Sequence, residues 1–512
     1  MRVYILTASL LLASSAAAHA PPHPPPPLPP PPPPPPARAG LTVKTSSGTY
    51  TGLINSTAPN VRQWLGIPYG KPPVGALRFM PPQKAPNYGA ADAKAYKPIC
   101  YQNSGPKTSL YWKLLPEYLN RDPESEDCLY LNIWAPRRPV EKKVPVIIWV
   151  SGGGFKEGGG HALYQVPDQW VQRMQTHIVV AFNFRLHIFG FPGSPAAPIN
   201  AGLLDLRLAV EWVKDNIGGF GGDSNRMILY GQSSGNDMVQ RYSYAYPKNS
   251  LVRGFIGESG GTPVTNPTSS PNFHNAAQIV GCANLTDTAE LACMQQVDPA
   301  SLQHAVDAIN PDPNRGLFRP IADNITTFTN LTERLEKGLI AKLPFIGGFM
   351  FNEGAVFLPF DPDATTAPTP IPIPGLEGLW CSIKSEVDKR NALGIPTYRY
   401  LYSGNFTNVT PRYWLAGMHS SAIPLVFGTH YQFRGNSTEF EWQTSFAMQE
   451  FWVSFAANPD AEPRNSLGQT WPRYQGPNGL IMNFGNASAA GGPSPAYVAP
   501  VSVADFYSGP CL

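Results

Sequence analysis

The chain has 512 residues, of which 14% are charged, and a formal net charge of +3 at neutral pH. This balance leaves no basic stripe on which a nucleic acid could bind and argues against a nucleic-acid partner. No Cys/His cluster has the spacing of a metal site and no Gly-x-Gly-x-x-Gly follows a strand. The sequence therefore predicts no metal and no cofactor.

The first 20 residues have the pattern of a signal peptide. Arg2 precedes an apolar stretch from Val3 to Leu12, and small residues end the pattern at Ala18-His19-Ala20, which matches an A-x-A cleavage site. No later segment has the roughly 18 uninterrupted apolar residues of a transmembrane helix. We therefore expect a secreted, extracellular protein without a transmembrane segment.

Residues 21–37 are interpreted as a proline-rich stalk. Fourteen prolines lie between Pro21 and Pro36, interrupted only by His23 and Leu28. Such a run adopts polyproline II, a stiff spacer about 50 Å long at ~3.1 Å per residue. It could bind a proline-recognising partner, but a solvated tether without chemistry is the simpler interpretation.

Cysteines and glycosylation sequons fit a secreted protein. Six cysteines predict three disulfides, although six cysteines allow fifteen pairings. Eight N-x-S/T sequons predict surface glycosylation. They are Asn55, Asn284, Asn324, Asn330, Asn405, Asn408, Asn436 and Asn486.

From residue 38 onward, buried-strand patterns alternate with helical patterns. Leu41 to Ile54 alternates apolar and polar residues around Ser47-Gly48, which predicts a hairpin. The predicted strands are Val144–Val150, Ile178–Phe184, Met227–Tyr230, Val252–Ile256, Leu343–Phe351 and Thr397–Tyr402. The predicted helices are Leu203–Ile217, the stretch after Ser233, and Phe440–Ala457. Continuous apolar strands between helices imply an α/β fold with a largely parallel, doubly wound sheet covered on both faces.

Residues 38–512 are interpreted as one catalytic domain, although length alone would suggest about three domains. The candidate site residues described below span positions 152 to 419. The stretch from Pro267 to Ile340 lacks strong strand runs and is predicted to be a helical excursion from this domain.

The most informative motif is Gly231-Gln232-Ser233-Ser234-Gly235, which directly follows the apolar run Met227–Tyr230. Its two glycines allow a sharp turn from strand to helix that exposes the serine hydroxyl at the end of the sheet, as in a nucleophile elbow. A second match, Gly257-Glu258-Ser259-Gly260-Gly261, leads into Pro263, where a helix would begin poorly. We therefore predict Ser233 as the nucleophile and Ser259 as a supporting serine.

A serine hydroxyl becomes a good nucleophile only with a histidine base and an acid that orients the histidine. In this fold class the acid and then the histidine follow the nucleophile along the chain, which leaves His419 and His430 as bases. His419 follows Gly417-Met418 in a loop-like stretch and is preferred, with His430 as the alternative. Glu353 is the predicted acid because it follows the strand run Leu343–Phe351.

Backbone N–H donors must also be present to stabilise a tetrahedral intermediate. Ser151-Gly152-Gly153-Gly154-Phe155 follows the strand Val144–Val150, and its glycines allow the backbone to approach a substrate closely. A flexible surface loop is the alternative, since Gly158-Gly159-Gly160 follows. The strand directly before the loop favours an oxyanion hole.

Taken together, these residues resemble the type-B carboxylesterase/lipase family, which includes cholinesterases and secreted fungal lipases. The resemblance runs from about Gly48 to Tyr474, and Tyr244-Ala245-Tyr246-Pro247 is most similar to secreted fungal members. The motifs that carry it are Gly66-Ile67-Pro68-Tyr69-Gly70-Lys71-Pro72-Pro73-Val74-Gly75, Arg78-Phe79, Ser125-Glu126-Asp127-Cys128-Leu129-Tyr130-Leu131-Asn132, Gly202-Leu203-Leu204-Asp205 and Phe220-Gly221-Gly222-Asp223. The resemblance implies the α/β-hydrolase fold with a large, mostly parallel central sheet and an N-terminal hairpin.

Carried over position by position, the resemblance implies a catalytic triad of Ser233, Glu353 and His419. It implies an oxyanion hole made by the N–H groups of Gly153, Gly154 and Ser234, and it implies that Ser259 supports the site without contacting the substrate. We also expect Gln232, next to the nucleophile, to support the site. It also implies the disulfides Cys100–Cys128 and Cys282–Cys293, and Cys381–Cys511 follows as the remaining pair.

The chain departs from the family pattern at four positions. Gln232 and Ser234 stand where the family often has Glu and Ala. Ser151 stands where His or Tyr is frequent, and Ala422 stands where an acid is common. None of these departures removes a triad member or an oxyanion donor, so they bear on substrate preference and rate.

The sequence therefore predicts a secreted serine carboxylic-ester hydrolase that acts on short to medium chain esters through an acyl-enzyme, with a small-molecule or lipid ester as its substrate. The nearer alternative is a lipase or sterol esterase acting at lipid surfaces. The more distant alternative is a non-catalytic adhesion or binding module on the same fold. The intact set of Ser233, Glu353 and His419 argues against that module.

The loop that a Cys100–Cys128 disulfide would close resembles the lid of lipase relatives. Six residues in this loop fall on one helical face and predict an amphipathic flap: Tyr111, Trp112, Leu114, Leu115, Tyr118 and Leu119. Pro116 interrupts that helix, so we expect a short, broken flap that shields the site only in part. A packed surface loop is the alternative.

Overall fold

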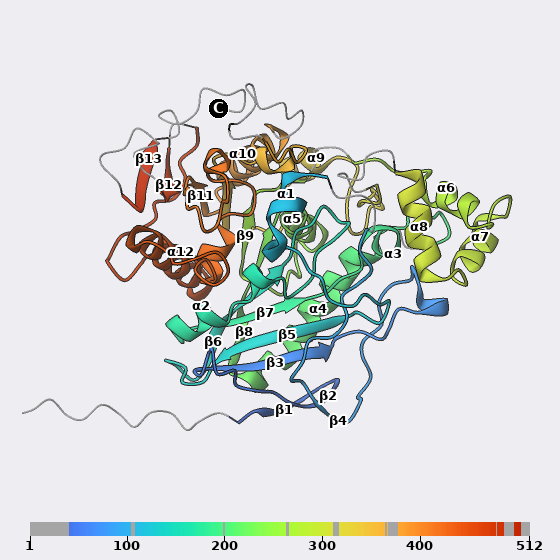
Figure 1. Cartoon of the computed structure of the whole chain (residues 1–512), viewed down its shortest axis with the longest axis horizontal. Helices are drawn as coiled ribbons and strands as arrows, with labels where there is room; N and C mark the ends of the chain where they lie inside the picture. Colours follow the sequence, from blue (N-terminus) through green and yellow to red (C-terminus); the bar gives the residue numbers. More distant parts are fainter. Residues whose placement is uncertain are drawn as a thin grey trace, which may run out of the picture. The chain divides into compact units, whose positions relative to one another are not determined.

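A ten-stranded sheet lies at the centre of the fold (Figure 1). Its strands, in spatial order, are β13 (Val498–Ser502), β12 (Leu480–Phe484), β11 (Thr397–Tyr402), β10 (Phe345–Met350), β9 (Gly254–Glu258), β8 (Gly222–Gln232), β6 (Val144–Val150), β7 (Ile178–Phe182), β5 (Tyr130–Pro136) and β3 (Val61–Pro68). All neighbouring pairs from β12 to β7 are parallel, and antiparallel strands lie at both edges. The predicted large, mostly parallel sheet is confirmed.

The computed structural model describes residues 40–103, 108–197, 200–262, 266–310, 317–363, 366, 377–477, 479–485 and 496–502. The predicted signal peptide at residues 1–20 and stalk at residues 21–37 lie outside the described residues, as do Asn486 and Cys511. Among the described residues, no helix is both long enough and apolar enough to cross a membrane.

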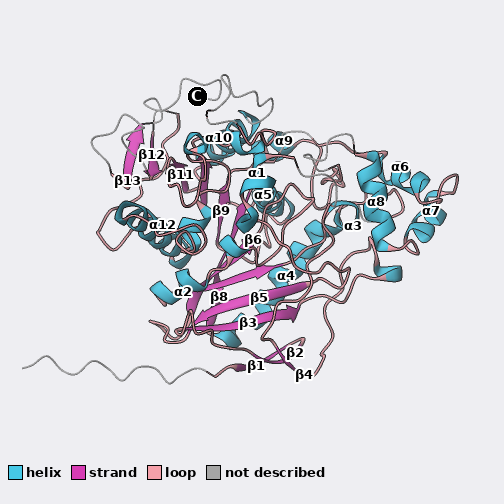
Figure 2. Cartoon of the chain, viewed as in Figure 1, coloured by secondary structure: helices cyan, strands magenta, loops and turns pink. Residues whose placement is uncertain are grey.

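Helices cover both faces of the sheet because the strands are apolar on both sides. Val146 and Ile148 of β6 point into one hydrophobic core, whereas Ile147 and Trp149 point into the other. The first core is covered by α4 (Ala201–Asn216), α5 (Ser234–Ala245) and α10 (Glu377–Ala392), and the second by α2 (Asp168–Met174), α11 (Ile423–Phe427) and α12 (Glu439–Ala457). Figure 2 shows these cyan helices flanking the magenta strands.

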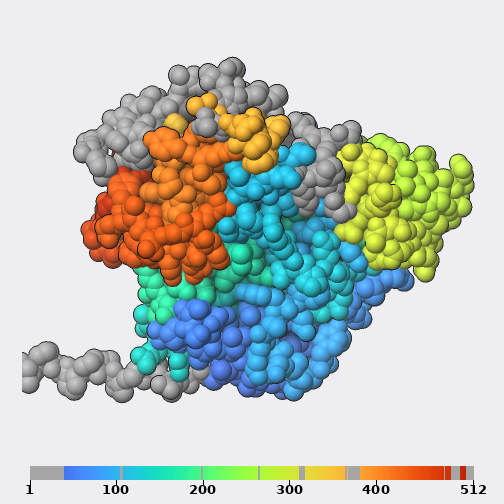
Figure 3. All heavy atoms as spheres, viewed as in Figure 1, coloured from blue at the N-terminus to red at the C-terminus, as the bar shows by residue number. Residues whose placement is uncertain are grey.

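The remaining elements lie around this core. The predicted N-terminal hairpin is β1 (Thr42–Thr45) and β2 (Gly48–Thr51), which joins β4 (Ala90–Asp92) in a small separate sheet. The helices between β9 and β10 are α6 (Asn272–Ile279), α7 (Asp287–Met294), α8 (Pro299–Ile309) and α9 (Leu331–Glu336), and the short helices α1 (Leu110–Leu114) and α3 (His187–Gly190) occur earlier. Figure 3 shows α6 to α8 gathered at the right of the view. No strand occurs in the described part of the predicted helical excursion.

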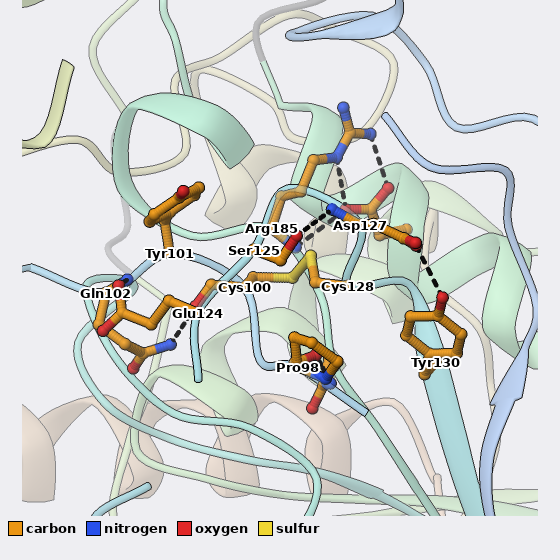
Figure 4. Close-up of a disulfide and its surroundings, with 12 residues drawn as sticks. Pro98, Cys100, Tyr101, Gln102, Glu124, Ser125, Asp127, Cys128, Tyr130 and Arg185 are labelled. Carbon is orange, nitrogen blue, oxygen red and sulfur yellow. Dashed lines mark hydrogen bonds and ion pairs between the residues drawn. A yellow bond between two sulfur atoms is a disulfide. The ribbon is translucent and has the colours of Figure 1, made fainter. Parts of the chain in front are cut away.

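Two of the implied disulfides are present. Cys100–Cys128 closes the loop that carries α1, and Figure 4 shows it beside Tyr101 and Arg185. Cys282–Cys293 joins the end of α6 to α7. The third implied pair, Cys381–Cys511, involves a residue outside the described part of the chain.

The predicted glycosylation sequons differ in solvent exposure, and Asn408 is buried whereas most of the others are exposed. Its side-chain nitrogen lies 3.0 Å from each of three acceptors: the carbonyl of His430, the hydroxyl of Ser437 and the carboxylate of Glu441. Only 8% of Asn408 is exposed. An N-glycan attaches to this nitrogen, so we expect Asn408 to carry none while the exposed asparagines are occupied.

Glycopeptide mass spectrometry of the protein from a glycosylating expression host measures this difference. The exposed sequon asparagines are Asn55, Asn284, Asn324, Asn330 and Asn436. Asn330 is an informative control because its side-chain oxygen caps α9 by accepting from the N–H of Glu333, which leaves its nitrogen available. A glycan on Asn408 would contradict the expectation.

Candidate active site

Ser233 occupies the turn between a strand and a helix. β8 ends at Gln232 and α5 begins at Ser234, so Ser233 alone connects them. Its backbone has φ 58° and ψ −127°, a region that costs a non-glycine residue about 1–3 kcal/mol. Gln232 and Ser234 are buried, whereas Ser233 is half-buried. The strained turn therefore presents the Ser233 side chain at the end of the sheet.

The two motif glycines are required by close packing at this turn. A Cβ atom at Gly231 would lie 2.4 Å from the carbonyl oxygen of Gly235. A Cβ atom at Gly235 would lie 2.1 Å from the carbonyl oxygen of Val150, at the end of β6. Any larger residue would push α5 away from the sheet. The glycines thus allow the helix to begin directly against the strands.

Glu353 and His419 meet at the same end of the sheet. Glu353 follows β10, and one of its carboxylate oxygens accepts from the N–H of Met350 at 2.8 Å. Its other oxygen lies 2.6 Å from Nδ1 of His419, and both side chains are buried. Asn352 donates its N–H to the carbonyl of Gly417 at 2.7 Å, which holds the two loops together. A buried carboxylate on Nδ1 fixes the imidazole ring with Nε2 as its free base.

Nε2 of His419 faces the elbow. The side-chain nitrogen of Gln232 lies 3.0 Å from this Nε2 and 2.9 Å from the hydroxyl oxygen of Ser420. Because Nδ1 carries the proton shared with Glu353, Nε2 accepts from the Gln232 amide. Within the described residues, the Ser233 hydroxyl makes no hydrogen bond to His419. Hydrogen bonds between a nucleophile and its base are often long or poorly aligned in sites without substrate and tighten when substrate binds.

The alternative histidine lies in a different cluster. Nδ1 of His430 is 2.6 Å from the hydroxyl of Ser437 and 3.2 Å from the carboxylate of Glu441, and all three groups are packed against the start of α12. His430 is fully buried. The structure thus brings His419, and not His430, to Gln232 and the elbow.

The glycine loop after β6 packs against the elbow. A Cβ atom at Gly152 would lie 2.9 Å from Cβ of Ser233. Gly153 has φ 129°, and a Cβ atom there would lie 2.0 Å from the carbonyl oxygen of Glu157. In the described chain, no protein group accepts from the N–H groups of Gly153, Gly154 and Ser234. Free N–H groups beside a serine hydroxyl are the donors that an oxyanion requires.

Ser259 lies beneath the elbow but is not bonded to the predicted triad. It has φ 50°, is fully buried, and donates its N–H to the carbonyl of Gly348 at 2.9 Å. Its hydroxyl has no hydrogen-bond partner among the described residues. A Cβ atom at Gly260 would lie 2.3 Å from the carbonyl oxygen of Ser233, so the segment after Ser259 packs directly against the backbone of the elbow. Its burial keeps the Ser259 hydroxyl away from any substrate.

Aromatic side chains line the approach to His419. The ring of Phe357 lies 5.0 Å from the imidazole ring of His419, and 38% of Phe357 is exposed. The ring of Tyr111, on α1, stacks on Phe357 at 6.2 Å. The flap predicted from the sequence is thus part of the wall of the site.

The flap is two short pieces and not one amphipathic helix. α1 ends at Leu114 and a 3-10 turn begins at Pro116, because proline cannot continue the hydrogen bonding of the helix. The prediction of a break at Pro116 is confirmed, and the prediction of one helical face through Leu119 is wrong. Leu115 and Leu119 are buried on either side of the break.

The flap is fastened to its surroundings. The N–H of Leu110 donates to the carbonyl of Leu358 at 2.9 Å. Arg434 forms an ion pair with Glu117 at 2.7 Å and also donates to the carbonyl of Leu114. Leu110 and Leu115 belong to a hydrophobic cluster with residues that flank Glu353 and His419, including Val356 and Met418. These contacts hold α1 against the residues that flank Glu353 and His419.

Comparison with known proteins places the chain in a family. Residues 39–370 match the sequence profile of the Carboxylesterase family. The chain is 42% identical over 463 residues to chlorogenic acid esterase from Aspergillus niger, covering 86% of this chain and 90% of that protein. The chain belongs to the carboxylesterase family. This carboxylesterase is also 36% identical to secreted lipase 5 from Gibberella zeae, over 85% of this chain and 88% of that protein. It is 29% identical to acetylcholinesterase from Bungarus fasciatus, over 85% of this chain and 82% of that protein.

Family membership establishes the reaction class. The α/β-hydrolase fold is the family fold, and the ten-stranded sheet agrees with it. The protein is a carboxylic ester hydrolase, as its named esterase and lipase relatives support. A purely non-catalytic binding module, the more distant alternative from the sequence, is not favoured.

Sequence reasoning missed several residues of this carboxylesterase site. Phe357 lies four positions after Glu353, and an aromatic residue so soon after the predicted acid was a usable signal. The sequence gave no indication that Arg434 belongs to the site, because its partner Glu117 lies 317 positions away in the chain. The contact between Gln232 and His419 likewise depends on the fold.

Proposed function

We propose that this carboxylesterase is a secreted serine esterase that works through an acyl-enzyme, with Ser233 as nucleophile, His419 as base and Glu353 as acid. The observation that carries the proposal is the 2.6 Å contact between Glu353 and Nδ1 of His419, next to a serine on a strained strand-to-helix turn. A fixed imidazole beside an exposed serine hydroxyl is the arrangement that nucleophilic acyl transfer requires.

The reaction proceeds in two halves. Nε2 of His419 takes the Ser233 proton as Oγ attacks the ester carbonyl, and a tetrahedral oxyanion forms. His419 then gives this proton to the leaving alcohol, and an ester of Ser233 remains. In the second half, His419 takes a proton from water, which attacks the acyl-enzyme and releases the acid while Oγ regains its proton.

Three backbone N–H groups, from Gly153, Gly154 and Ser234, would stabilise the oxyanion. Each such donor is worth about 2.7–4 kcal/mol of the activation barrier. Their availability supports the assignment, because no protein acceptor in the described chain competes for them. Glu353 would accept from Nδ1 of His419 and stabilise the imidazolium form of His419.

Secretion is part of the proposal. Residues 1–20 would be removed as a signal peptide, residues 21–37 would remain as a proline-rich stalk, and residues 38–512 would form the catalytic domain. Two disulfides support an oxidising compartment, since such bonds persist outside the cytosol. The relative from Gibberella zeae is itself named a secreted lipase.

The fixed flap favours short to medium acyl chains. A lipase lid must move aside at a lipid surface, whereas α1 is held by the ion pair between Arg434 and Glu117 and by the Leu110–Leu358 hydrogen bond. We therefore expect kcat/KM for p-nitrophenyl esters to peak at short or medium chains, without a jump in rate above the solubility limit. Arg434→Gln should loosen the wall and extend the range towards longer chains.

The same ester panel decides between the candidate substrates. A steep increase in rate on emulsified long-chain triacylglycerol would favour the lipase alternative. The aromatic stack of Tyr111 and Phe357 beside His419 supports a second candidate, an ester with an aromatic acyl group. Chlorogenic acid esterase, a relative with 42% identity, is named for such a substrate. A higher kcat/KM for cinnamoyl than for butanoyl esters, reduced by Phe357→Leu, would select it.

A further inference from the structure

A fully buried carboxyl group lies under the elbow and has no role in the proposed reaction. Glu258, from the second Gly-x-Ser-x-Gly match, is the last residue of β9 and has no exposed surface. One carboxyl oxygen accepts from the hydroxyl of Tyr230 at 2.8 Å and from that of Tyr400 at 3.0 Å. The other oxygen has no hydrogen-bond partner in the described chain.

This environment differs from that of other buried carboxylates in the fold. Asp205 forms a bidentate pair with Arg185, and Glu386 pairs with Arg390. Glu258 has only the hydroxyls of Tyr230 and Tyr400 as donors. Burial raises the pKa of both tyrosines well above the usual value, so both hydroxyls are neutral. A buried carboxyl without a cation holds its proton more tightly than one in water.

Glu258 is next to the elbow in the sheet. Glu258 and Gln232 are register partners on the neighbouring parallel strands β9 and β8, about 4.8 Å apart. The carbonyl of Glu258 accepts the N–H of Ser233 at 2.8 Å. Side chains of register partners lie on the same face of a sheet, and the Gln232 side chain on this face reaches His419. The carboxyl group thus lies one strand away from Gln232, whose side chain contacts the proposed base.

Its ionisation falls near neutral pH. Burial raises the pKa of Glu258 to about 7; the hydroxyls of Tyr230 and Tyr400 lower it, and the charge of Glu353 raises it. The other titratable groups nearby are Tyr402 on β11 and, beyond Tyr402, Glu441 on α12. His419 is linked to this cluster through Glu353, whose carboxylate lies 2.6 Å from its Nδ1. The charge of Glu353 therefore acts on Glu258, and both side chains are fully buried.

We propose that Glu258 is a positioning residue for the esterase reaction: its ionised carboxylate stabilises the imidazolium that forms on His419 during acyl transfer. This inference rests on the proposed function of His419 as base. At acid pH Glu258 is neutral and adds no charge. As pH rises, Glu258 releases its proton to solvent, and a second negative charge joins that of Glu353 beside the imidazolium. We expect this added charge to change the rate by about three- to tenfold.

The pH dependence of a Glu258→Gln variant tests this effect. The amide has nearly the same shape but cannot ionise. With a soluble short-chain ester, the ratio of wild-type to Glu258→Gln kcat/KM is expected to rise about three- to tenfold between pH 5.5 and 8.5. A ratio that stays constant over this range would overturn the proposal, because a merely structural defect lowers the rate equally at every pH.

Two tyrosine variants provide a matched pair. Tyr400→Phe removes a hydrogen bond that favours the ionised carboxylate, so the rate increase should shift to higher pH. Tyr402→Phe changes a buried tyrosine of the same strand that is not bonded to Glu258, and no shift is expected. Equal shifts in both variants, or none in Tyr400→Phe, would count against the carboxylate.

Thermal unfolding separates failure of this inference from failure of the proposed function. The pKa of Glu258 is raised from 4.5 to about 7 on folding, so its contribution to stability is complete below pH 4.5 and is lost as pH rises through 7. The Tm of the wild type should therefore fall more than that of Glu258→Gln between pH 5 and 7.5. Equal falls overturn the inference even if Ser233→Ala is inactive. Hydrolysis by Ser233→Ala overturns the proposed function, whatever the Tm values show.

Discussion

Replacing Ser233 by alanine is expected to lower kcat for ester hydrolysis by a factor on the order of 10⁶ and to abolish covalent labelling by a fluorophosphonate. In the proposed mechanism the Ser233 hydroxyl forms the acyl-enzyme, and water attacks the carbonyl far more slowly without it. The fold should persist, because alanine retains the Cβ atom at this φ of 58°. Initial rates with a soluble p-nitrophenyl ester measure the loss.

Ser259→Ala is the matched control, since Ser259 lies in the second Gly-x-Ser-x-Gly match and also has a positive φ. Its hydroxyl is fully buried, so the variant should keep fluorophosphonate labelling, with a reduced rate if this serine supports the site. Mass spectrometry of the labelled peptide identifies the modified serine. An adduct on Ser259, or undiminished turnover by Ser233→Ala, contradicts the assignment.

The central strands could be predicted because they are buried on both faces. β6 and β11 occur with the predicted bounds, Val144–Val150 and Thr397–Tyr402, since continuous apolar runs have clear ends. β8 begins at Gly222 and not at Met227, because Gly222 already pairs with Val144 of β6. A register shift follows, and regular pairing resumes with Met227 opposite Val146. Pairing between distant segments, which periodicity does not report, decides such boundaries.

The outer strands were not predicted. β3 contains Arg62 and Gln63, which interrupt its apolar pattern. Arg62 is nevertheless buried and donates to the carbonyls of Pro136 and Phe220. Tertiary contacts therefore provide hydrogen-bond acceptors for a charged side chain that the sequence alone would place in solvent. β12 and β13 form the opposite edge. At sheet edges, the partners of polar groups lie outside the strand, and the sequence alone does not name them.

The candidate site was predictable to the extent that chain order constrains it. The order of Ser233, Glu353 and His419 follows from the fold class, and the 2.6 Å contact between the last two agrees with it. The groups that modulate the site were not predictable. Glu258 belongs to the second Gly-x-Ser-x-Gly match, which was not predicted to hold the nucleophile. Its place one strand from Gln232 follows from the pairing of β8 with β9.

Replacing His419 by glutamine is expected to lower kcat by a factor on the order of 10⁶, with a much smaller change in KM. An amide can still donate a hydrogen bond to Glu353, but it cannot take the proton of Ser233 at neutral pH. Because Gln232 and Ser420 remain in place, the shape of the site should change little. Steady-state kinetics at pH 7.5, with the fluorophosphonate labelling rate as a second readout, measure the effect.

His430→Gln is the matched control for the base. Its imidazole contacts Ser437 and Glu441 at the start of α12, so the change should lower the Tm by weakening buried polar contacts. The turnover of the folded variant should stay within a few-fold of wild type when measured well below its Tm. If His430→Gln is folded but inactive while His419→Gln turns over normally, the base is His430. The 3.0 Å contact between Gln232 and His419 would then have to be a structural contact, with no part in acyl transfer.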